Sequence, residues 1–330
     1  MATVLRHQGP EIPQNTTSKV SFFRSQLILF NSRRKHGLLY SLATAGGLFC
    51  VPGVLGVIAS ETEIDLLIER TVPLPFITLM ITVGMFVLND LVDVELDRTS
   101  SKKRPIPSGL VSKRQAWTFI ILTNGAAVGM LLIRLDLVSI MLVLPMILIG
   151  IIYSMTKIAL MKRFLLKNIA IAIFYMLCGI LGMTSSYGTG LVTNNPIVLL
   201  HTIAISGIMI FVGSIVNDLG DTEGDREAGR RTIPVVLGGE NTIKMLIILL
   251  VIMPAISWML YSTYAKYAYH AISMTAPIGV TIVASLALVR MTSIQKVFED
   301  RDSMRKQHKK WFPLYMVLQS CHVIAALLPL

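Results

Sequence analysis

The sequence has few charged residues for its length. Asp, Glu, Lys and Arg make up 15% of 330 residues, whereas 53% are hydrophobic. A soluble domain of ordinary composition carries about 25% charged residues. The scarcity of charge therefore excludes an ordinary soluble domain.

Cysteine and histidine are also scarce. The three cysteines, Cys50, Cys178 and Cys321, lie within apolar runs and lack metal-ligand spacing, and the six histidines are scattered. We interpret the cysteines as small buried hydrophobic residues and assign no histidine to a metal. Residues 1–35 are polar and basic without an apolar core segment, so we expect no cleavable signal peptide, and residues 1–20 are predicted to be a flexible tail.

Long apolar runs fill the remainder of the chain. A membrane-spanning helix needs about 20 apolar residues, and helices satisfy their backbone hydrogen bonds internally. The sequence predicts an all-α polytopic membrane protein with about nine helices, and residues 21–330 as a single domain. The predicted spans are 36–60, 73–90, 114–134, 136–155, 164–184, 196–218, 242–262, 268–290 and 311–330.

Basic residues outnumber acidic ones, with a net charge of +11. Their distribution argues against nucleic acid as a partner. With nine spans, 27 of the 30 Lys and Arg residues fall on the side that holds the N-terminus, and only Arg70, Arg134 and Lys266 fall on the other. Cytosolic loops of membrane proteins are enriched in Lys and Arg. The N-terminus and the loops beside the second and sixth spans are thus predicted to be cytosolic.

Acidic residues are few, yet one acidic pattern occurs twice. The segment Asn89–Arg98 recurs as Asn217–Arg226 with seven of ten residues identical, each time at the end of an apolar run. The repeat indicates duplication of a four-helix unit, with the ninth helix closing the bundle. On a helix, aspartates at i, i+3 and i+7 fall within roughly a 60° arc. Carboxylates this close repel one another unless cations lie between them, and acidic groups at a membrane are costly enough to imply a function.

Oxygen ligands in this number are typical of Mg²⁺, which readily shares substrate phosphates. The two copies therefore predict a Mg²⁺–diphosphate site. The predicted metal ligands are Asp90, Asp93, Asp97, Asp218, Asp221 and Asp225, and these six aspartates with Lys162 are the predicted catalytic residues. The predicted diphosphate-binding residues are Asn89, Arg98, Lys102, Lys103, Arg104, Tyr153, Lys162, Arg226, Arg230 and Arg231.

A prenyl diphosphate matches this combination of charge and apolar surface. Its diphosphate needs divalent metal and basic side chains, and its isoprenoid tail needs an apolar channel. As the carbon–oxygen bond breaks, Mg²⁺ and cations stabilise the leaving diphosphate, and the protein excludes water from the allylic cation. The expected partners are a polyprenyl diphosphate donor, the lipid bilayer and a small acceptor.

The same motifs resemble those of the UbiA superfamily of intramembrane prenyltransferases over nearly the whole chain. Asn89–Arg98 running into Arg104–Gly109 is similar to the family's first motif, and Asp221–Arg226 to its second. Tyr153 and Ser154, through Lys162 to Asn168, resemble the segment after the fourth helix. The resemblance implies nine helices around a central cavity, Mg²⁺ dependence and a polyprenyl diphosphate donor, for example of the geranylgeranyl type. The first helix, at Arg33–His36, departs from the family by lacking an Arg-Pro start.

Three functions stay open at this stage. The first is a prenyltransferase that joins a polyprenyl chain to a small acceptor. The second is a UbiA-type terpene cyclase, which ionises and cyclises a prenyl diphosphate without an acceptor. The third is a transporter or channel with acidic rings. Transport is disfavoured because the acidic clusters lie at one membrane face beside basic loops.

Overall fold

The computed structural model describes residues 20–50, 72–99, 104–134, 137–154, 160–194, 196–264 and 273–327. Every regular element within these ranges is a helix, which confirms the all-α prediction. The predicted tail, residues 1–20, lies outside the described residues except for its last residue. The helices are α1 (Phe22–Phe49), α4 (Pro73–Val92), α5 (Val94–Thr99), α6 (Lys113–Arg134), α7 (Leu137–Ser154), η1 (Leu160–Lys162), α8 (Phe164–Asn194), α9 (Pro196–Leu219), α10 (Thr222–Glu227), α11 (Ile233–Leu237), α12 (Gly239–Tyr264), α13 (Thr275–Gln295), α14 (Arg301–Lys309) and α15 (Phe312–Leu327).

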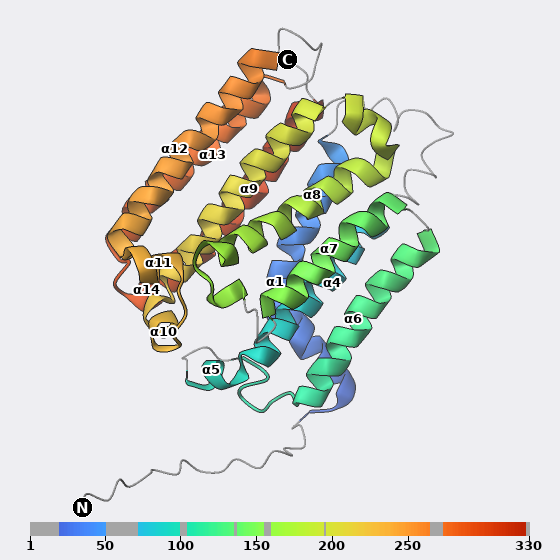
Figure 1. Cartoon of the computed structure of the whole chain (residues 1–330), viewed down its shortest axis with the longest axis vertical. Helices are drawn as coiled ribbons and strands as arrows, with labels where there is room; N and C mark the ends of the chain where they lie inside the picture. The colour runs from blue at the N-terminus through green and yellow to red at the C-terminus, as the bar shows by residue number, and fades with distance from the viewer. Residues whose placement is uncertain are drawn as a thin grey trace, which may run out of the picture.

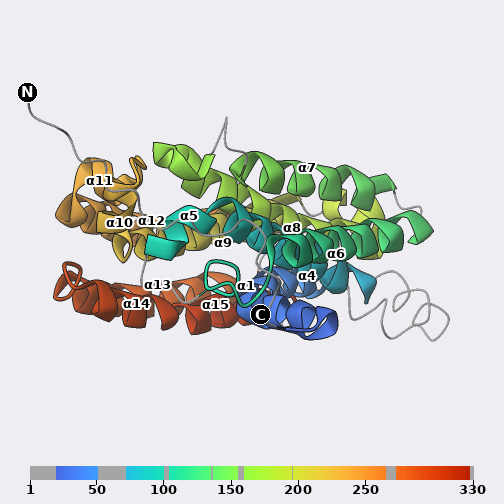
Figure 2. The ribbon, with the colours of Figure 1, turned by 90° about the horizontal axis from the view of Figure 1, so that it is seen from below.

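The long helices form one bundle, and the short helices α5, α10, α11 and α14 gather at one of its ends (Figure 1). Helix α1 packs against α4, α8 and α15, while α9, α12 and α13 continue the bundle from α8 back to α15. Seen from the end with the short helices, α1, α13 and α15 lie along one side and α7 along the other (Figure 2). Helix α5 lies between these two sides, and α10 lies beside α11 toward one edge of this view.

Seven helices of the described chain are long and apolar enough to cross a membrane. They correspond to the second through eighth predicted spans. The ninth, α15, has 16 residues and is shorter than a usual span. The first, α1, has 28 residues but carries four basic side chains, among them Arg33. The polytopic membrane fold is therefore confirmed, with nine as an approximate count.

The bounds of the first helix differ from the prediction. Residues 36–60 were expected to span, whereas α1 begins earlier, at Phe22, and runs to Phe49; residues 51–60 lie outside the described residues. The basic residues around Arg33 had suggested a loop outside the membrane. In the bundle Arg33 is instead paired with the buried Asp90 of α4, so the helix continues through this basic stretch. A buried charge of one sign thus allows the opposite charge inside the bundle.

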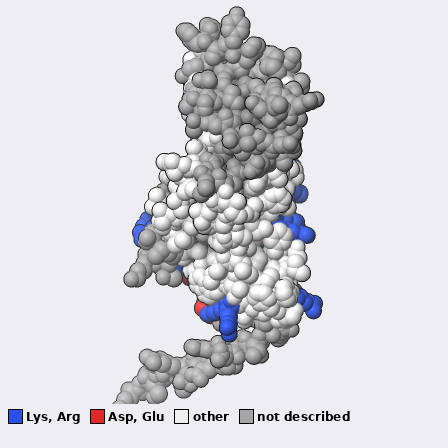
Figure 3. Space-filling view, turned by 90° about the vertical axis from the view of Figure 1, so that its right-hand side faces the viewer, with Lys and Arg blue, Asp and Glu red and all other residues white. Residues whose placement is uncertain are grey.

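The outer face of the bundle is apolar. On α7, Leu137, Met141, Leu144 and Leu148 recur at helical spacing and are each more than half exposed. Such a stripe is costly in water and favourable in lipid. The face drawn in Figure 3 is largely uncharged where it is described, with Lys and Arg side chains at its margins and lower part.

Candidate active site

Each aspartate motif spans a break between a long helix and a short one. Helix α4 ends at Val92 and α5 begins at Val94, so Asp93 lies at the junction, as Asp221 does between α9 and α10. The expectation of one continuous helix is corrected here. Each junction aspartate still begins the hydrogen bonding of its short helix, because the Asp97 amide donates to the Asp93 carbonyl at 2.8 Å and the Asp225 amide donates to the Asp221 carbonyl at 2.9 Å.

A cavity of about 440 Å³ lies between the two motifs. Its charged lining includes five of the six predicted aspartates, and only Asp90 is absent. Its basic lining comprises Arg33, Arg104, Lys167 and Arg230. The structure therefore brings residues from both halves of the duplicated chain to a single cavity. The predicted residues that line it are Asn89, Asp93, Asp97, Arg104, Tyr153, Asp218, Asp221, Asp225 and Arg230.

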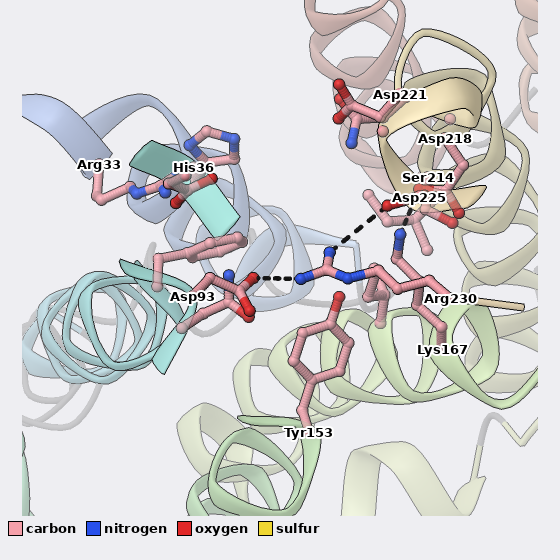
Figure 4. Close-up of a pocket in the computed structure, with 18 of the residues that line it drawn as sticks. Arg33, His36, Asp93, Tyr153, Lys167, Ser214, Asp218, Asp221, Asp225 and Arg230 are labelled. Carbon is pink, nitrogen blue, oxygen red and sulfur yellow. Dashed lines mark hydrogen bonds and ion pairs between the residues drawn. The ribbon is translucent and has the colours of Figure 1, made fainter. Parts of the chain in front are cut away.

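Arg230 joins the two motifs across the cavity. Its guanidinium donates to the Asp93 carboxylate at 2.8 Å and lies 3.6 Å from the Asp225 carboxylate. Figure 4 shows Arg230 between these two aspartates, with the Tyr153 hydroxyl directed toward it. Gly229, whose φ is +65°, precedes Arg230, and the Arg230 amide donates to the Asp225 carbonyl at 2.8 Å. This left-handed turn reverses the chain after α10 and directs Arg230 into the cavity.

Two further sets of ion pairs hold Asp90, Asp97 and Asp218. Arg104 pairs with Asp90 and lies 2.6 Å from Asp97, and Arg33 donates to Asp90 from α1. In the second motif, the Lys167 ammonium lies 2.5 Å from Asp218. Basic side chains therefore separate the carboxylates, which sequence reasoning had assigned to metal ions alone.

Burial and neighbouring charges shift the titration of two groups outside the spans. Burial raises the pKa of the Asp225 carboxyl, against the lowering effect of the Lys167 ammonium. Burial alone would lower the pKa of Arg230, but the nearby Asp93 carboxylate outweighs it and raises that pKa. Arg230 is therefore a permanent cation at this position.

Several predicted diphosphate-binding residues lie elsewhere. Lys162, in η1, and Arg231 are exposed and do not line the cavity, although the Arg231 amide donates to the Lys162 carbonyl at 3.1 Å. Arg226 is exposed and pairs with Glu223 at 2.6 Å. Lys162 therefore lies on the surface next to the loop that carries Arg230, outside the cavity lining. Lys102, Lys103 and the Arg98 side chain lie outside the described residues.

Sequence reasoning missed two cations of the cavity, Arg33 and Lys167. Lys167 lies within a predicted span, 164–184, and an ionisable residue inside a span is by itself a signal of function. Arg33 preceded the predicted first span and gave no comparable signal. Asn168, at 0% exposure, was named only as part of a motif, yet its amide donates to Ser214 at 2.9 Å and to Asp218 at 3.1 Å.

The donor atoms of the cavity suit Mg²⁺. The Asn89 Oδ1 and Asp225 Oδ2 atoms are buried and have no hydrogen-bond partner among the described residues. Both are hard oxygen donors, the type that Mg²⁺ prefers. No group of three His, Cys, Asp or Glu residues in the described ranges is close enough to hold a metal alone. This fits an ion that keeps several waters and takes further ligands from a substrate phosphate.

The cavity changes from charged to apolar with depth in the bundle. Beside the charged groups it is lined by apolar and aromatic side chains, including Tyr40, Phe86 and Ile171. These three residues also line a second space of about 70 Å³ between α4, α7 and α8. A ligand with an anionic head and a hydrocarbon tail matches this arrangement.

Comparisons with known proteins agree with the geometry. The model of the UbiA prenyltransferase family matches residues 44–310. The chain is 25% identical over 224 residues to digeranylgeranylglyceryl phosphate synthase from Methanosphaera stadtmanae, covering 67% of this chain and 75% of that protein. It is 28% identical to the chloroplastic chlorophyll synthase of Avena sativa, covering 59% of this chain and 51% of that protein.

Solved structures share the fold. A UbiA homologue from Archaeoglobus fulgidus bound to GPP and Mg²⁺ has a TM-score of 0.59 and 17% identity, covering 90% of this chain and 99% of that one. A structure described as digeranylgeranylglyceryl phosphate synthase in membranes has a TM-score of 0.62 and 18% identity, covering 93% and 99%. On the family match over residues 44–310, this chain is a member of the UbiA prenyltransferase family.

Proposed function

We propose that this protein is a Mg²⁺-dependent intramembrane prenyltransferase that transfers the prenyl group of a polyprenyl diphosphate to a small acceptor and releases diphosphate. One observation carries the proposal: the cavity that holds aspartates of both motifs and four basic side chains is also lined by Tyr40, Phe86 and Ile171, which border an adjoining apolar space inside the bundle. The geranylgeranyl type of donor is supported by the relatives named digeranylgeranylglyceryl phosphate synthase.

In the proposed reaction the carbon–oxygen bond of the allylic diphosphate breaks, and its electron pair stays on the diphosphate. The allylic cation then accepts an electron pair from the acceptor, which loses a proton as the new bond forms. When bound, Mg²⁺ supplies positive charge that stabilises the leaving diphosphate. Asp93, Asp97, Asp221 and Asp225 would hold it, because these four carboxylates line the cavity. Asp218 lines it as well, but both of its oxygens are bonded to Lys167 and Asn168.

The chain's own residues carry the rest of the work. Arg104, Lys167 and Arg230 direct positive charge into the cavity, where the leaving diphosphate develops negative charge. Tyr40, Phe86 and Ile171 enclose the first isoprene units of the tail and keep water from the allylic cation.

The direct test is to incubate purified protein in lipid nanodiscs with prenyl diphosphates of increasing length. Diphosphate release is measured with Mg²⁺ and with excess EDTA, and products are extracted in the presence and absence of acceptors. Release that requires Mg²⁺ and yields a prenylated acceptor is expected. Full turnover in EDTA would contradict the metal requirement. Cyclic hydrocarbons formed without acceptor would identify a terpene cyclase instead.

Lys162 is a separate element of the proposal. We expect from the sequence that it aids departure of the diphosphate, yet its exposed position in η1 supports a weaker role than that of Lys167. Measuring kcat and KM for Lys162→Ala with the donor varied tests this. A fall in kcat would support a contact in the transition state, and no change would leave Lys162 an ordinary cytosolic-side cation.

A further inference from the structure

The first aspartates of the two motifs have matching surroundings. Asp90 at the end of α4 is 2% exposed, and Asp218 at the end of α9 is 1% exposed. Both oxygens of each carboxylate are occupied by side-chain donors. Asp90 accepts hydrogen bonds from Arg33, with Nε at 2.6 Å, and from Arg104. Asp218 accepts from the Lys167 ammonium at 2.5 Å and from the Asn168 amide at 3.1 Å.

The cation in each pair comes from the corresponding helix of the duplicated unit. Arg33 lies in α1, the first helix of the first four-helix half, and Lys167 in α8, the first helix of the second half. Each reaches the first aspartate of the motif on the next long helix of its half. The duplication thus includes a buried cation–aspartate pair that the sequence repeat alone does not reveal, because the cations are Arg in one half and Lys in the other.

Both pairs present a cation to the cavity. Arg33 and Lys167 line it, Asp90 lies outside its lining, and Asp218 lines it but has both carboxylate oxygens bonded to Lys167 and Asn168. A lysine is a flexible point charge on a long stem, so a buried carboxylate that fixes its ammonium lowers the cost of ordering it for a ligand. The carboxylate thereby acts on a ligand through the cation.

We propose that Asp90 and Asp218 are positioning residues, which hold Arg33 and Lys167 at the cavity wall to bind the diphosphate, while the second and third aspartates of each motif bind Mg²⁺. This inference rests on the proposed function. It divides each motif into one anchor and two metal ligands, although the three aspartates of a motif are indistinguishable by residue type. Burial alone does not mark the anchor, because Asp93, Asp97 and Asp225 are buried as well. The anchor is the aspartate whose two carboxylate oxygens both accept hydrogen bonds from side-chain donors.

Metal binding separates the two roles without relying on turnover. Mn²⁺ replaces Mg²⁺ as a spectroscopic probe, and its binding is measured by electron paramagnetic resonance in the presence of inorganic diphosphate. Asp218→Asn should bind Mn²⁺ with an affinity within about twofold of the wild type, since no ligand is lost. Asp221→Asn should weaken binding by about tenfold or more. A loss in Asp218→Asn equal to that in Asp221→Asn would overturn the proposal.

Turnover then tests whether Asp218 acts through Lys167. Asp218→Asn and Lys167→Met should both lower kcat, and the double variant should be no slower than Lys167→Met alone, because the anchor has no function once its cation is gone. Losses that multiply in the double variant would contradict the inference. The exposed Lys244→Met, on α12, is the matched loss of a lysine outside the cavity and should leave turnover unchanged.

The same set of variants provides a control for loss of folding. Asp218→Asn leaves the buried Lys167 ammonium without its counterion, which is strongly destabilising. The Mn²⁺ measurement is therefore repeated on the Lys167→Met/Asp218→Asn double variant, which leaves no unpaired charge. Near wild-type binding by the double variant supports the proposal, and weakened binding opposes it. Failure of the wild type to bind Mn²⁺ with diphosphate would instead contradict the proposed function.

Discussion

At the residue scale, burial and ion pairing distinguish basic side chains that the sequence predicts alike as diphosphate-binding residues. Arg226 and Arg230 follow the same motif, four residues apart. The Arg230 side chain is 11% exposed and held between Asp93 and Asp225, whereas that of Arg226 is 56% exposed and pairs with Glu223. An exposed ion pair of this kind contributes little to stability because water screens it. A charge inside a cavity that excludes water interacts much more strongly with a ligand.

Arg230→Ala is therefore expected to lower kcat with a prenyl diphosphate by about 100-fold or more, the usual cost of losing a donor to developing charge. Arg226→Ala should change kcat by less than about threefold, as expected for an exposed pair. The measurement is the initial rate of diphosphate release at saturating donor. Equal losses in the two variants would show that the cavity geometry does not determine their roles.

At this scale the sequence predicts the aspartates of the site but misses two of its basic residues, Arg33 and Lys167. The aspartates are predictable because a repeated acidic motif at the end of an apolar run is costly and conspicuous. Arg33 and Lys167 are not, because each is recognised only through the carboxylate that it meets on a neighbouring helix. Such a pairing depends on how α1 packs on α4 and α8 on α9, which residue spacing within one helix does not determine.

At the element scale, the turn after α10 sets the direction of Arg230. Gly229 has a φ of +65°, a region that costs an L-residue with a Cβ about 1–2 kcal/mol. Gly229→Ala should lower the thermal midpoint and also reduce turnover, since the next residue is Arg230. Gly229→Asn should be milder on both measures, because Asn tolerates this conformation. Equal damage by Ala and Asn would indicate that backbone conformation is not the cause.

The contact between α1 and α8 depends on glycine in a different way. A Cβ at Gly182 of α8 would collide with the Thr44 carbonyl oxygen and approach the Leu48 amide of α1 to 2.9 Å. A Cβ at Gly179, one turn earlier, would meet no atom within 4 Å. Small residues let helices approach closely in membranes, where backbone atoms cannot move aside cheaply.

Gly182→Ala should therefore lower the thermal midpoint in detergent or nanodiscs, by separating α1 from α8, while Gly179→Ala leaves it unchanged. The same separation moves Arg33 and Lys167, which lie on these two helices, so Gly182→Ala should also weaken diphosphate binding. A stable Gly182→Ala protein would mean that the two helices can part without cost.

At the scale of the whole molecule, the bounds of the nine long helices of the described chain follow the sequence prediction except at α1 and at the end of α8, which runs to Asn194 instead of residue 184. Hydropathy locates helices surrounded by lipid, since most of their residues are apolar. It fails at α1 because the basic stretch near Arg33 is neutralised within the bundle rather than exposed to water. The central cavity follows from the duplication, which brings two copies of one motif to the same end.

Orientation in the membrane is the prediction that belongs to the whole molecule. The cavity end is the side on which 27 of the 30 Lys and Arg residues were counted, so it should face the cytosol. Ser108 is exposed near this end, before α6, and Ser262 is exposed near the opposite end of α12. Single cysteines are introduced at these positions in a variant that lacks Cys50, Cys178 and Cys321. In sealed cells a membrane-impermeant thiol reagent should then label Ser262→Cys but reach Ser108→Cys only after the membrane is opened.

Labelling of both from outside would refute the bundle's passage across the bilayer, and the reverse pattern would place the cavity on the outer face. In that case the cytosolic pool of prenyl diphosphate could not reach the aspartates directly, so this measurement also bears on how the donor enters the site.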